Sequence, residues 1–357
     1  MGFLAGSPKA NFDDKMDAQA ATLFGVPLKY VSLLTLVVQN SMLVLVMKYS
    51  RRAEAETGGP YLASTAVMLS ELSKLVICLV LHMRDPTNGR PSVDKLYADM
   101  FGPESDAWKM MVPAALYVVQ NNLQYLAVTN LDPATFQVSY QMKILTTAVF
   151  SVIMLNRSLT RLKWLSLVML TFGIALVQIP PTTSTSSTGA NERSGMQQLI
   201  GLSAVAVACV LSGLAGVWFE KVLKGSKASL WLRNTQLSFF SLIPCLTGII
   251  FLDGSKIAQD GLFQGYTRWT FGAIACQAIG GLIVALVVKY ADNILKGFAT
   301  SISIILSAVA SVFLFDFQIS LSFCVGASIV LYATHLYGLP DATKQEYTQV
   351  KQMEGRV

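Results

Sequence analysis

Two uncharged runs of the sequence, residues 269–288 and 297–315, are each long enough to cross a lipid bilayer. A hydrocarbon layer about 30 Å thick is crossed by roughly 20 apolar residues in a helix. The polar segment between the runs contains Lys289 and Lys296, and it is therefore predicted to connect two membrane helices tightly. The same criteria predict ten spans, at about 29–49, 61–83, 108–129, 132–155, 162–179, 198–220, 230–252, 269–289, 294–315 and 318–338.

The composition agrees with a protein that crosses the bilayer many times. Only 13% of the 357 residues are charged, and the mean hydropathy is +0.51. The net charge of +6 does not form a basic stripe, because the basic residues are scattered in short loops, and no nucleic-acid partner is expected. If the amino terminus is cytosolic, most of the 27 Lys and Arg residues also fall on that side, which predicts that both termini are cytosolic.

A faint internal repeat divides the spans into two halves. Positions about 160 residues apart carry the same residue at several places, such as Asp132 with Asp292 and Ser151 with Ser311. A Ser/Thr-rich linker at 180–197 separates the halves and is predicted to be lumenal. Because a unit of five spans must insert its second copy upside down, we expect inverted repeats at 29–179 and 198–338, with tails at 1–28 and 339–357.

No motif of an enzyme active site is found in the sequence. His82 and His335 are far apart, and the five cysteines fall within predicted spans without Cys-x-x-Cys spacing. Neither an enzyme, a metal site nor a cofactor is therefore expected. A membrane enzyme would need a cluster of carboxylates or histidines. A channel or scaffold would not need inverted repeats around lysines. A saturable exchange assay distinguishes both alternatives from a transporter.

Lys143 is the charge whose position in a predicted span most needs an explanation. It is expected near the middle of a span with Tyr140 close by, where a charge costs about 2.5–3.5 kcal/mol. Either backbone carbonyls hold it as a structural cation, or it binds an anionic substrate. In the third span, Gln120 lies beside Tyr117 and Asn121, whose polar groups suit a nucleobase, sugar hydroxyls or hydrogen bonds between helices.

Other polar and small residues within the spans are candidates for structural or gating roles. Glu71 and Lys74 share a helix face, where they can neutralise each other. Lys289 is expected to reach the membrane surface, whereas Lys296 begins a span, where free N–H groups also favour a phosphate. Close helix packing is the expected role of four glycines, namely Gly213, Gly216, Gly280 and Gly281.

Several long stretches resemble the eukaryotic nucleotide-sugar transporters of the solute-carrier class. These are residues 117–122, 130–147, 154–159, 213–224 and 289–301, and the similarity extends from Lys29 to Pro340. The resemblance implies an all-α integral membrane protein with the drug/metabolite transporter fold, in which ten helices form two inverted five-helix repeats. It also implies a Golgi antiporter that imports a nucleotide sugar and exports the nucleoside monophosphate.

The resemblance further implies which residues bind the substrate. The nucleobase would contact Tyr117, Gln120 and Asn121, and the phosphates would contact Lys143 and Lys296. The pocket wall would be formed by Ser212, Gly213, Gly216 and Asn234. The family usually has Tyr at the position of Phe136, so the cavity surface there is expected to differ.

The choice of sugar rests on shorter segments. Residues 229–234 and 337–340 resemble the UDP-galactose transporters, and 61–67 resembles the UDP-N-acetylglucosamine branch. UDP-galactose in exchange for UMP is the favoured assignment, with UDP-N-acetylglucosamine, CMP-sialic acid or dual UDP-sugar specificity as alternatives. The partners expected besides these nucleotides are the lipid bilayer, a second copy of the chain and glycosyltransferases.

Overall fold

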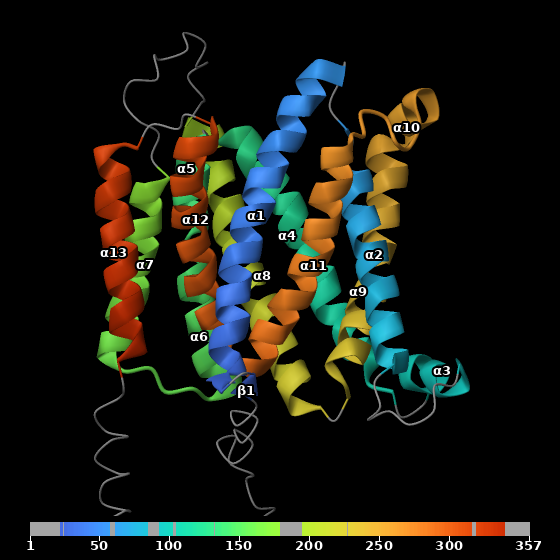
Figure 1. Cartoon of the computed structure of the whole chain (residues 1–357), viewed down its shortest axis with the longest axis horizontal. Coiled ribbons are helices and arrows are strands. Elements are labelled where there is room, and N and C mark those ends of the chain that lie inside the picture. Colours follow the sequence, from blue (N-terminus) through green and yellow to red (C-terminus); the bar gives the residue numbers. More distant parts are fainter. Residues whose placement is uncertain are drawn as a thin grey trace, which may run out of the picture.

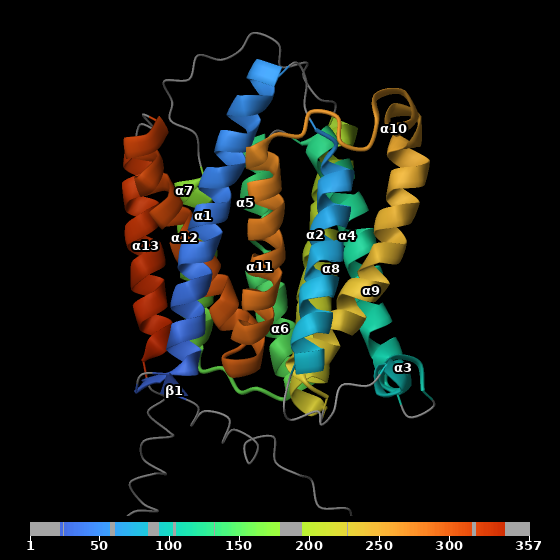
Figure 2. The same ribbon diagram turned by 45° about the vertical axis from the view of Figure 1, so that its right-hand side comes forward.

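The computed structural model describes residues 22–23, 25–57, 61–84, 93–102, 105–131, 133–178, 195–226, 228–315 and 319–339. In these residues the chain is helical, apart from a short antiparallel hairpin of β1 (Thr22–Leu23) and β2 (Val26–Pro27). The helices stand side by side in one bundle (Figures 1 and 2). We call the side of the bundle where β1 and α3 lie the β1 side, and the opposite side, where α10 lies, the α10 side.

In the part of the chain that the structure describes, the bundle is built from eleven helices, of which the short α5 and α6 together take the place of one span. They are α1 (Leu28–Thr57), α2 (Ala63–Arg84), α4 (Met111–Asn130), α5 (Pro133–Tyr140), α6 (Lys143–Leu155), α7 (Arg161–Val177), α8 (Gly195–Gly225), α9 (Leu230–Gly248), α11 (Arg268–Tyr290), α12 (Asn293–Phe315) and α13 (Leu321–Gly338). Within the described residues, eight helical segments are long and apolar enough to cross a membrane. The other two predicted spans correspond to α4, which carries several amide side chains, and to α7, which has 17 residues.

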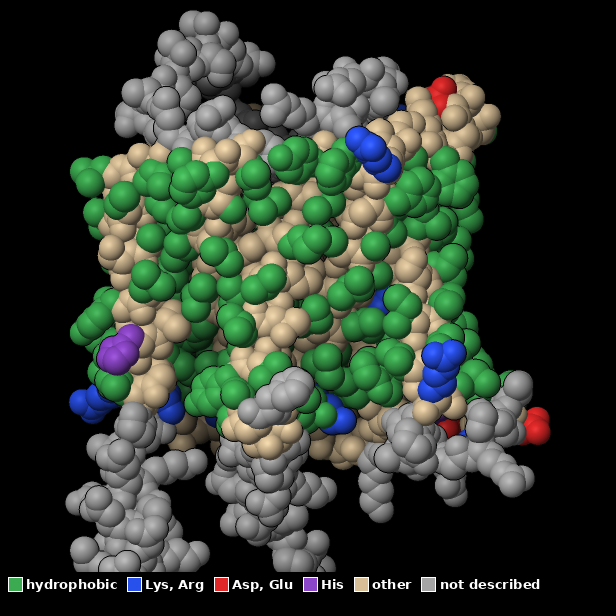
Figure 3. All heavy atoms as spheres, in the orientation of Figure 1, with side chains coloured by type: hydrophobic (Ala, Val, Ile, Leu, Met, Phe, Trp, Pro, Cys, Tyr) green, Lys and Arg blue, Asp and Glu red, His purple; other side chains and the backbone are tan. Residues whose placement is uncertain are grey.

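The outer surface of the bundle is apolar. Figure 3 shows hydrophobic side chains across the middle of one face, with Lys and Arg side chains gathered mainly along its β1-side edge. Large apolar side chains point outward from several helices, including Phe172, Phe251 and Phe313. Such a broad exposed apolar surface is compatible with a lipid surround, because only internally hydrogen-bonded helices or closed barrels are stable in hydrocarbon.

Helices from the two halves of the chain pack against each other. α7 packs on α13 and α2 on α9, while α1 lies against α11 and α12, and α8 lies against α4 and α6. The α7–α13 contact is close because Gly173 and Gly326 face each other. A Cβ at Gly326 would come within 2.6 Å of the Gly173 carbonyl oxygen. These two glycines therefore let the helix backbones approach to a separation that a side chain would prevent.

The predicted span at 132–155 is not one continuous helix. It breaks at Gln141 and Met142, so that Lys143 begins α6 instead of lying within an unbroken helix. The thiol of Cys209 in α8 lies 3.5 Å from the carbonyl oxygen of Tyr140 and donates a hydrogen bond to it, which satisfies a backbone group at the break. Broken helices of this kind are tolerated in membranes where protein or a polar interior covers the freed backbone.

Two short helices were not predicted from the sequence. α3 (Val93–Phe101) lies across the β1 side, and α10 (Gly254–Asp260) follows a π-helical turn at Ile249–Asp253. α8 begins at Gly195, within the segment predicted to be a linker. Asp132 of the internal repeat and residues 180–194 lie outside the described residues.

Candidate functional site

Lys143 faces the interior of the bundle. Its Nζ atom lies 4.4 Å from the centre of the Tyr140 ring, and its charge acts on the buried thiol of Cys209 in α8. A lysine directed towards lipid would contact neither of these groups. The break between α5 and α6 therefore places this ammonium group among α5, α6 and α8.

Lys296 is the second interior cation. It lies one turn into α12, where its backbone N–H donates to the Asp292 carbonyl oxygen at 3.0 Å. Its side chain is close enough to Lys143 for the two charges to repel, and Glu220 also acts on it. Within the described part of the chain, no carboxylate lies within 4 Å of either Nζ atom. Two neighbouring lysines with no carboxylate this close are costly in a membrane interior, and an anion would relieve that cost.

Tyr140 connects Lys143 to the polar face of α4. Its hydroxyl accepts a hydrogen bond from Nε2 of Gln120 at 2.9 Å and also bonds with Ser212 of α8. Tyr117 lies close to the same hydroxyl. Phe136 stacks on the Tyr140 ring, with centroids 5.5 Å apart and planes 13° from parallel.

The amides of α4 differ in their surroundings. The side chain of Gln120 is buried, and its Oε1 atom has no hydrogen-bond partner among the described residues. Asn121 is exposed, and its Oδ1 accepts a weak bond from Gln124 at 3.3 Å. An amide oxygen without a partner beside an accessible amide leaves hydrogen-bonding capacity for a ligand.

The four predicted packing glycines all lie where a helix meets a neighbouring side chain. A Cβ at Gly213 would approach Thr146 of α6 at 2.8 Å, and one at Gly281 would approach Lys74 at 2.9 Å. Gly216 packs against Asn293 and Gly280 against Gln39. Gly213 and Gly216, expected in the pocket wall, therefore lie in helix contacts that position α8.

The remaining candidates lie at other places in the bundle. Glu71 and Lys74 form an ion pair of 2.7 Å within α2, and Oε2 of Glu71 has no partner among the described residues. Asn234 is buried in α9, and its amide donates to the Leu230 carbonyl oxygen at 2.9 Å. Lys289 is exposed at the β1-side end of α11, as expected for a lysine that reaches the membrane surface.

Sequence reasoning missed a cluster of charges around Glu220. This side chain is fully buried in α8 and accepts hydrogen bonds from Arg157 at 2.6 Å, Lys224 at 2.8 Å and the backbone N–H of Asn293 at 3.0 Å. Arg157 also pairs with Asp292 at 3.3 Å. Burial lowers the pKa of Arg157, but Asp292 and Glu220 outweigh this effect and raise it above its usual value.

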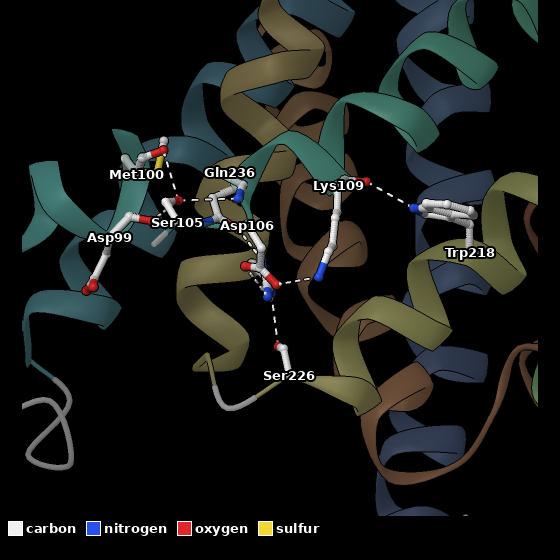
Figure 4. Close-up of polar contacts among 10 residues, drawn as sticks. Asp99, Met100, Ser105, Asp106, Lys109, Trp218, Ser226 and Gln236 are labelled. Atoms are coloured by element: carbon white, nitrogen blue, oxygen red, sulfur yellow. Dashed lines mark hydrogen bonds and ion pairs between the residues drawn. The ribbon is translucent and has the colours of Figure 1, made fainter. Parts of the chain in front are cut away.

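A second network ties α3 to α9 on the β1 side (Figure 4). Arg233, which is 1% exposed, pairs with Asp106 at 2.6 Å, and Lys109 pairs with the same carboxylate at 3.1 Å. Gln236 donates to the Asp99 carbonyl oxygen at 3.1 Å. Burial raises the pKa of Asp106, but the hydrogen bonds from Arg233 and Lys109 prevail and hold it below its usual value. Arg233 lies in the first turn of α9, and its pairing with Asp106 could not be predicted from its neighbours in sequence.

A bundle of membrane-spanning helices with interior lysines, amides and an aromatic ring defines the class: a membrane transport protein with a polar internal site. Within the described residues, no group of three or more His, Cys, Asp or Glu residues could hold a metal ion.

The comparison with known proteins gives the family. The model of the nucleotide-sugar transporter family matches residues 25–338, so this chain belongs to that family, whose members are transporters and not enzymes. It is 50% identical over 321 residues to the UDP-galactose transporter of Schizosaccharomyces pombe, covering 89% of this chain and 90% of that protein.

Two human relatives are similar to a comparable degree. The UDP-N-acetylglucosamine transporter is 49% identical over 313 residues, with 87% of this chain and 95% of that protein covered. The UDP-galactose translocator is 48% identical over 314 residues, with 88% and 78% covered. A crystal structure only 12% identical superposes with a TM-score of 0.62 over 87% of this chain and 96% of that chain, which shows a shared fold alone.

Proposed function

We propose that this protein is an antiporter that carries UDP-galactose into the Golgi lumen and returns UMP to the cytosol. The observation that carries the proposal is the pair of interior lysines, Lys143 and Lys296, which repel each other and have no carboxylate within 4 Å among the described residues. A pyrophosphate or phosphate between them would neutralise both charges. The family membership supports a nucleotide sugar as the source of that phosphate.

The nucleobase is assigned to the polar face of α4. Gln120 and Asn121 supply amide groups, and Tyr117 and Tyr140 supply aromatic surface, within reach of the Lys143 side of the site. This arrangement suits a ligand with a flat hydrogen-bonding base at one end and phosphates at the other. The choice of UDP-galactose is supported by the relative named for it, and another relative named for UDP-N-acetylglucosamine supports the alternative.

We further propose that ten spans form two inverted five-helix repeats, with both termini in the cytosol. The helix contacts support this arrangement, because exchanging the halves maps each main contact either onto another main contact or, for α7–α13 and α2–α9, onto itself. Under that exchange α1 corresponds to α8, α4 to α11 and α6 to α12. The α1–α11 contact then corresponds to α8–α4, and α1–α12 corresponds to α8–α6. Repeats of this kind build two gates around one site.

Exchange follows from the charges. An empty site leaves both lysines unpaired, which opposes passage through a closed intermediate, and either nucleotide can supply the missing phosphate. The protein should therefore change between its two open states far more readily with a nucleotide bound than with the site empty. If the β1 side faces the cytosol, the UDP-sugar enters the site from the β1 side and UMP is released on the same side.

A transport assay tests the proposal directly. Purified protein in liposomes should take up labelled UDP-galactose when UMP is inside, and hardly at all when the liposomes are empty. UDP-N-acetylglucosamine and CMP-sialic acid, measured in parallel, decide among the candidate substrates. Equal uptake with and without internal UMP would contradict exchange, and uptake of none of the three would contradict the proposed function.

A further inference from the structure

Three segments that are far apart in sequence, and whose charged residues lie outside the proposed transport site, meet at Glu220. Arg157 follows α6, Glu220 and Lys224 lie near the end of α8, and Asp292 with Asn293 connects α11 to α12. Each of these elements reaches its end on the β1 side. The Glu220 cluster, as we call these five residues, therefore joins parts of the bundle that are far apart in sequence.

The cluster is balanced in charge and densely bonded. Glu220 is fully buried, whereas the side chains of Arg157, Lys224 and Asp292 are 25%, 20% and 17% exposed. Lys224 also donates to the Ala291 carbonyl oxygen at 2.5 Å. Two acids and two bases in mutual contact leave no net charge, so the cluster is stable when it is closed to water.

The cluster lies between the interior lysines and the β1 side. Glu220 accepts from the backbone N–H of Asn293, and Lys296 lies three residues, or about 4.5 Å of helix rise, further into α12. Gly216, one turn before Glu220, packs directly on the side chain of Asn293, so α8 meets the start of α12 at this level too. Movement of a substrate from Lys296 to the β1 side would have to separate these elements.

We infer that the Glu220 cluster is the gate on the β1 side of the site, and that Glu220 holds it shut by bonding α8 to both the segment after α6 and the start of α12. This inference rests on the proposed transport site at Lys143 and Lys296. Opening requires the bonds to Arg157 and Asn293 to break, and the fully buried carboxylate then becomes hydrated. A shared acceptor couples the elements, because release of Glu220 removes two contacts between them at once, the bonds to Arg157 and to Asn293. The Arg157–Asp292 pair and the Lys224–Ala291 bond must then also break for the gate to open.

The accessibility of a reporter cysteine tests the gate without a transport assay. Thr300 lies one turn beyond Lys296 on the same face of α12, so a Thr300→Cys reporter is placed in protein that keeps the buried Cys209 and has the other four cysteines replaced. The same protein without the reporter gives the background labelling. A membrane-impermeant maleimide is applied from each side of sealed vesicles. We expect Glu220→Gln to speed labelling from the β1 side by about tenfold, equivalent to about 1.4 kcal/mol of lost closed-state stability, and not to speed it from the α10 side.

Two further variants make the result decisive. Arg157→Gln removes a partly exposed partner and leaves Glu220 bonded to Lys224 and Asn293, so this variant should fold. It should also raise the rate of β1-side labelling. If Glu220→Gln does not fold, the result with Arg157→Gln tests the gate in its place. Asp106→Asn removes an ion pair on the same side but outside the cluster, and should leave labelling unchanged. Unchanged labelling in both gate variants, or faster labelling from both sides, would overturn the gate. Faster β1-side labelling in a protein that exchanges no nucleotide would instead overturn the proposed function alone.

Discussion

The Nζ atom of Lys143 lies 4.4 Å from the centre of the Tyr140 ring, across the two-residue break between α5 and α6. The hydroxyl of the same ring accepts a hydrogen bond from Gln120. One side chain thus joins the proposed phosphate-binding cation to the proposed nucleobase-binding face. A cation over an aromatic face is stabilised by the ring, which helps to hold an ammonium group where no carboxylate is near.

Substitution of Tyr140 should separate these two contacts. Tyr140→Phe keeps the ring beside Lys143 but leaves the Gln120 amide without its partner, and a buried unpaired group costs about 1–3 kcal/mol. We expect the KM for UDP-sugar exchange to rise on the order of tenfold. Tyr140→Ala, which also removes the ring, should lower transport further. Equal exchange rates in the two variants would show that the ring contact with Lys143 contributes nothing.

The close crossing of α7 and α13 makes a prediction about stability. Gly326→Ala would drive a methyl group against the backbone of α7, where a Cβ comes within 2.7 Å of the Val177 nitrogen. Overpacking against backbone costs about 1–3 kcal/mol, so the midpoint of thermal unfolding in detergent should fall. The control is Gly248→Ala in α9, because no atom lies within 4 Å of its Cβ position. A drop in Gly248→Ala as large as that in Gly326→Ala would contradict the packing argument.

The Asp106–Arg233 pair predicts a pH dependence. The hydrogen bonds from Arg233 and Lys109 lower the pKa of Asp106 below its usual 3.8 in the folded state. The stabilisation is therefore complete above that value and is lost as the pH falls through the folded pKa. Thermal unfolding of the wild-type protein should lose stability more steeply below about pH 4 than that of Asp106→Asn. Parallel pH profiles for the two proteins would show that the pair does not stabilise the fold.

Variants of the partly buried pair of Glu71 and Lys74 distinguish a structural role from a transport role. Removing one partner leaves a partly buried charge without its counter-ion, which is destabilising, whereas replacing both removes that penalty. If the pair is structural, Glu71→Gln combined with Lys74→Met should be more stable than either single variant and should still exchange nucleotide. A stable double variant that binds UMP but does not exchange it would assign the pair to transport.

Much of the helical architecture could be predicted from the sequence, because the length of an apolar run reports directly on whether it can cross a bilayer. All ten predicted runs overlap described helices, but the break at Gln141 and Met142 was missed, since neither proline nor glycine marks it. The thiol of Cys209, which donates to a backbone carbonyl at the break, is remote in sequence. α3 was missed because a nine-residue amphipathic helix is too short to give a membrane-span signal.

Only some residues of the candidate site could be predicted from the sequence. Lys143 and Lys296 stood out because charge is rare within spans, and the structure brings them together. Glu220 did not stand out in the sequence, because it lies at the end of its predicted span, where a charged residue is common. Its importance comes from Arg157 and Asn293, which approach it only in the folded bundle. Sequence periodicity reports on which residues share a helix face, and not on which helices meet.

The claim that the two interior lysines bind a phosphate is tested most directly by comparing the binding of UMP and uridine. These ligands share the nucleobase and ribose and differ only in the phosphate. The wild-type protein should bind UMP at least about tenfold more tightly than uridine. Lys143→Ala should clearly reduce that difference while still binding uridine, because Lys296 alone remains to contact the phosphate. The control is Lys221→Ala, which removes an exposed lysine near the end of α8 and should retain the full preference for UMP over uridine. An undiminished preference for UMP in Lys143→Ala would contradict the account.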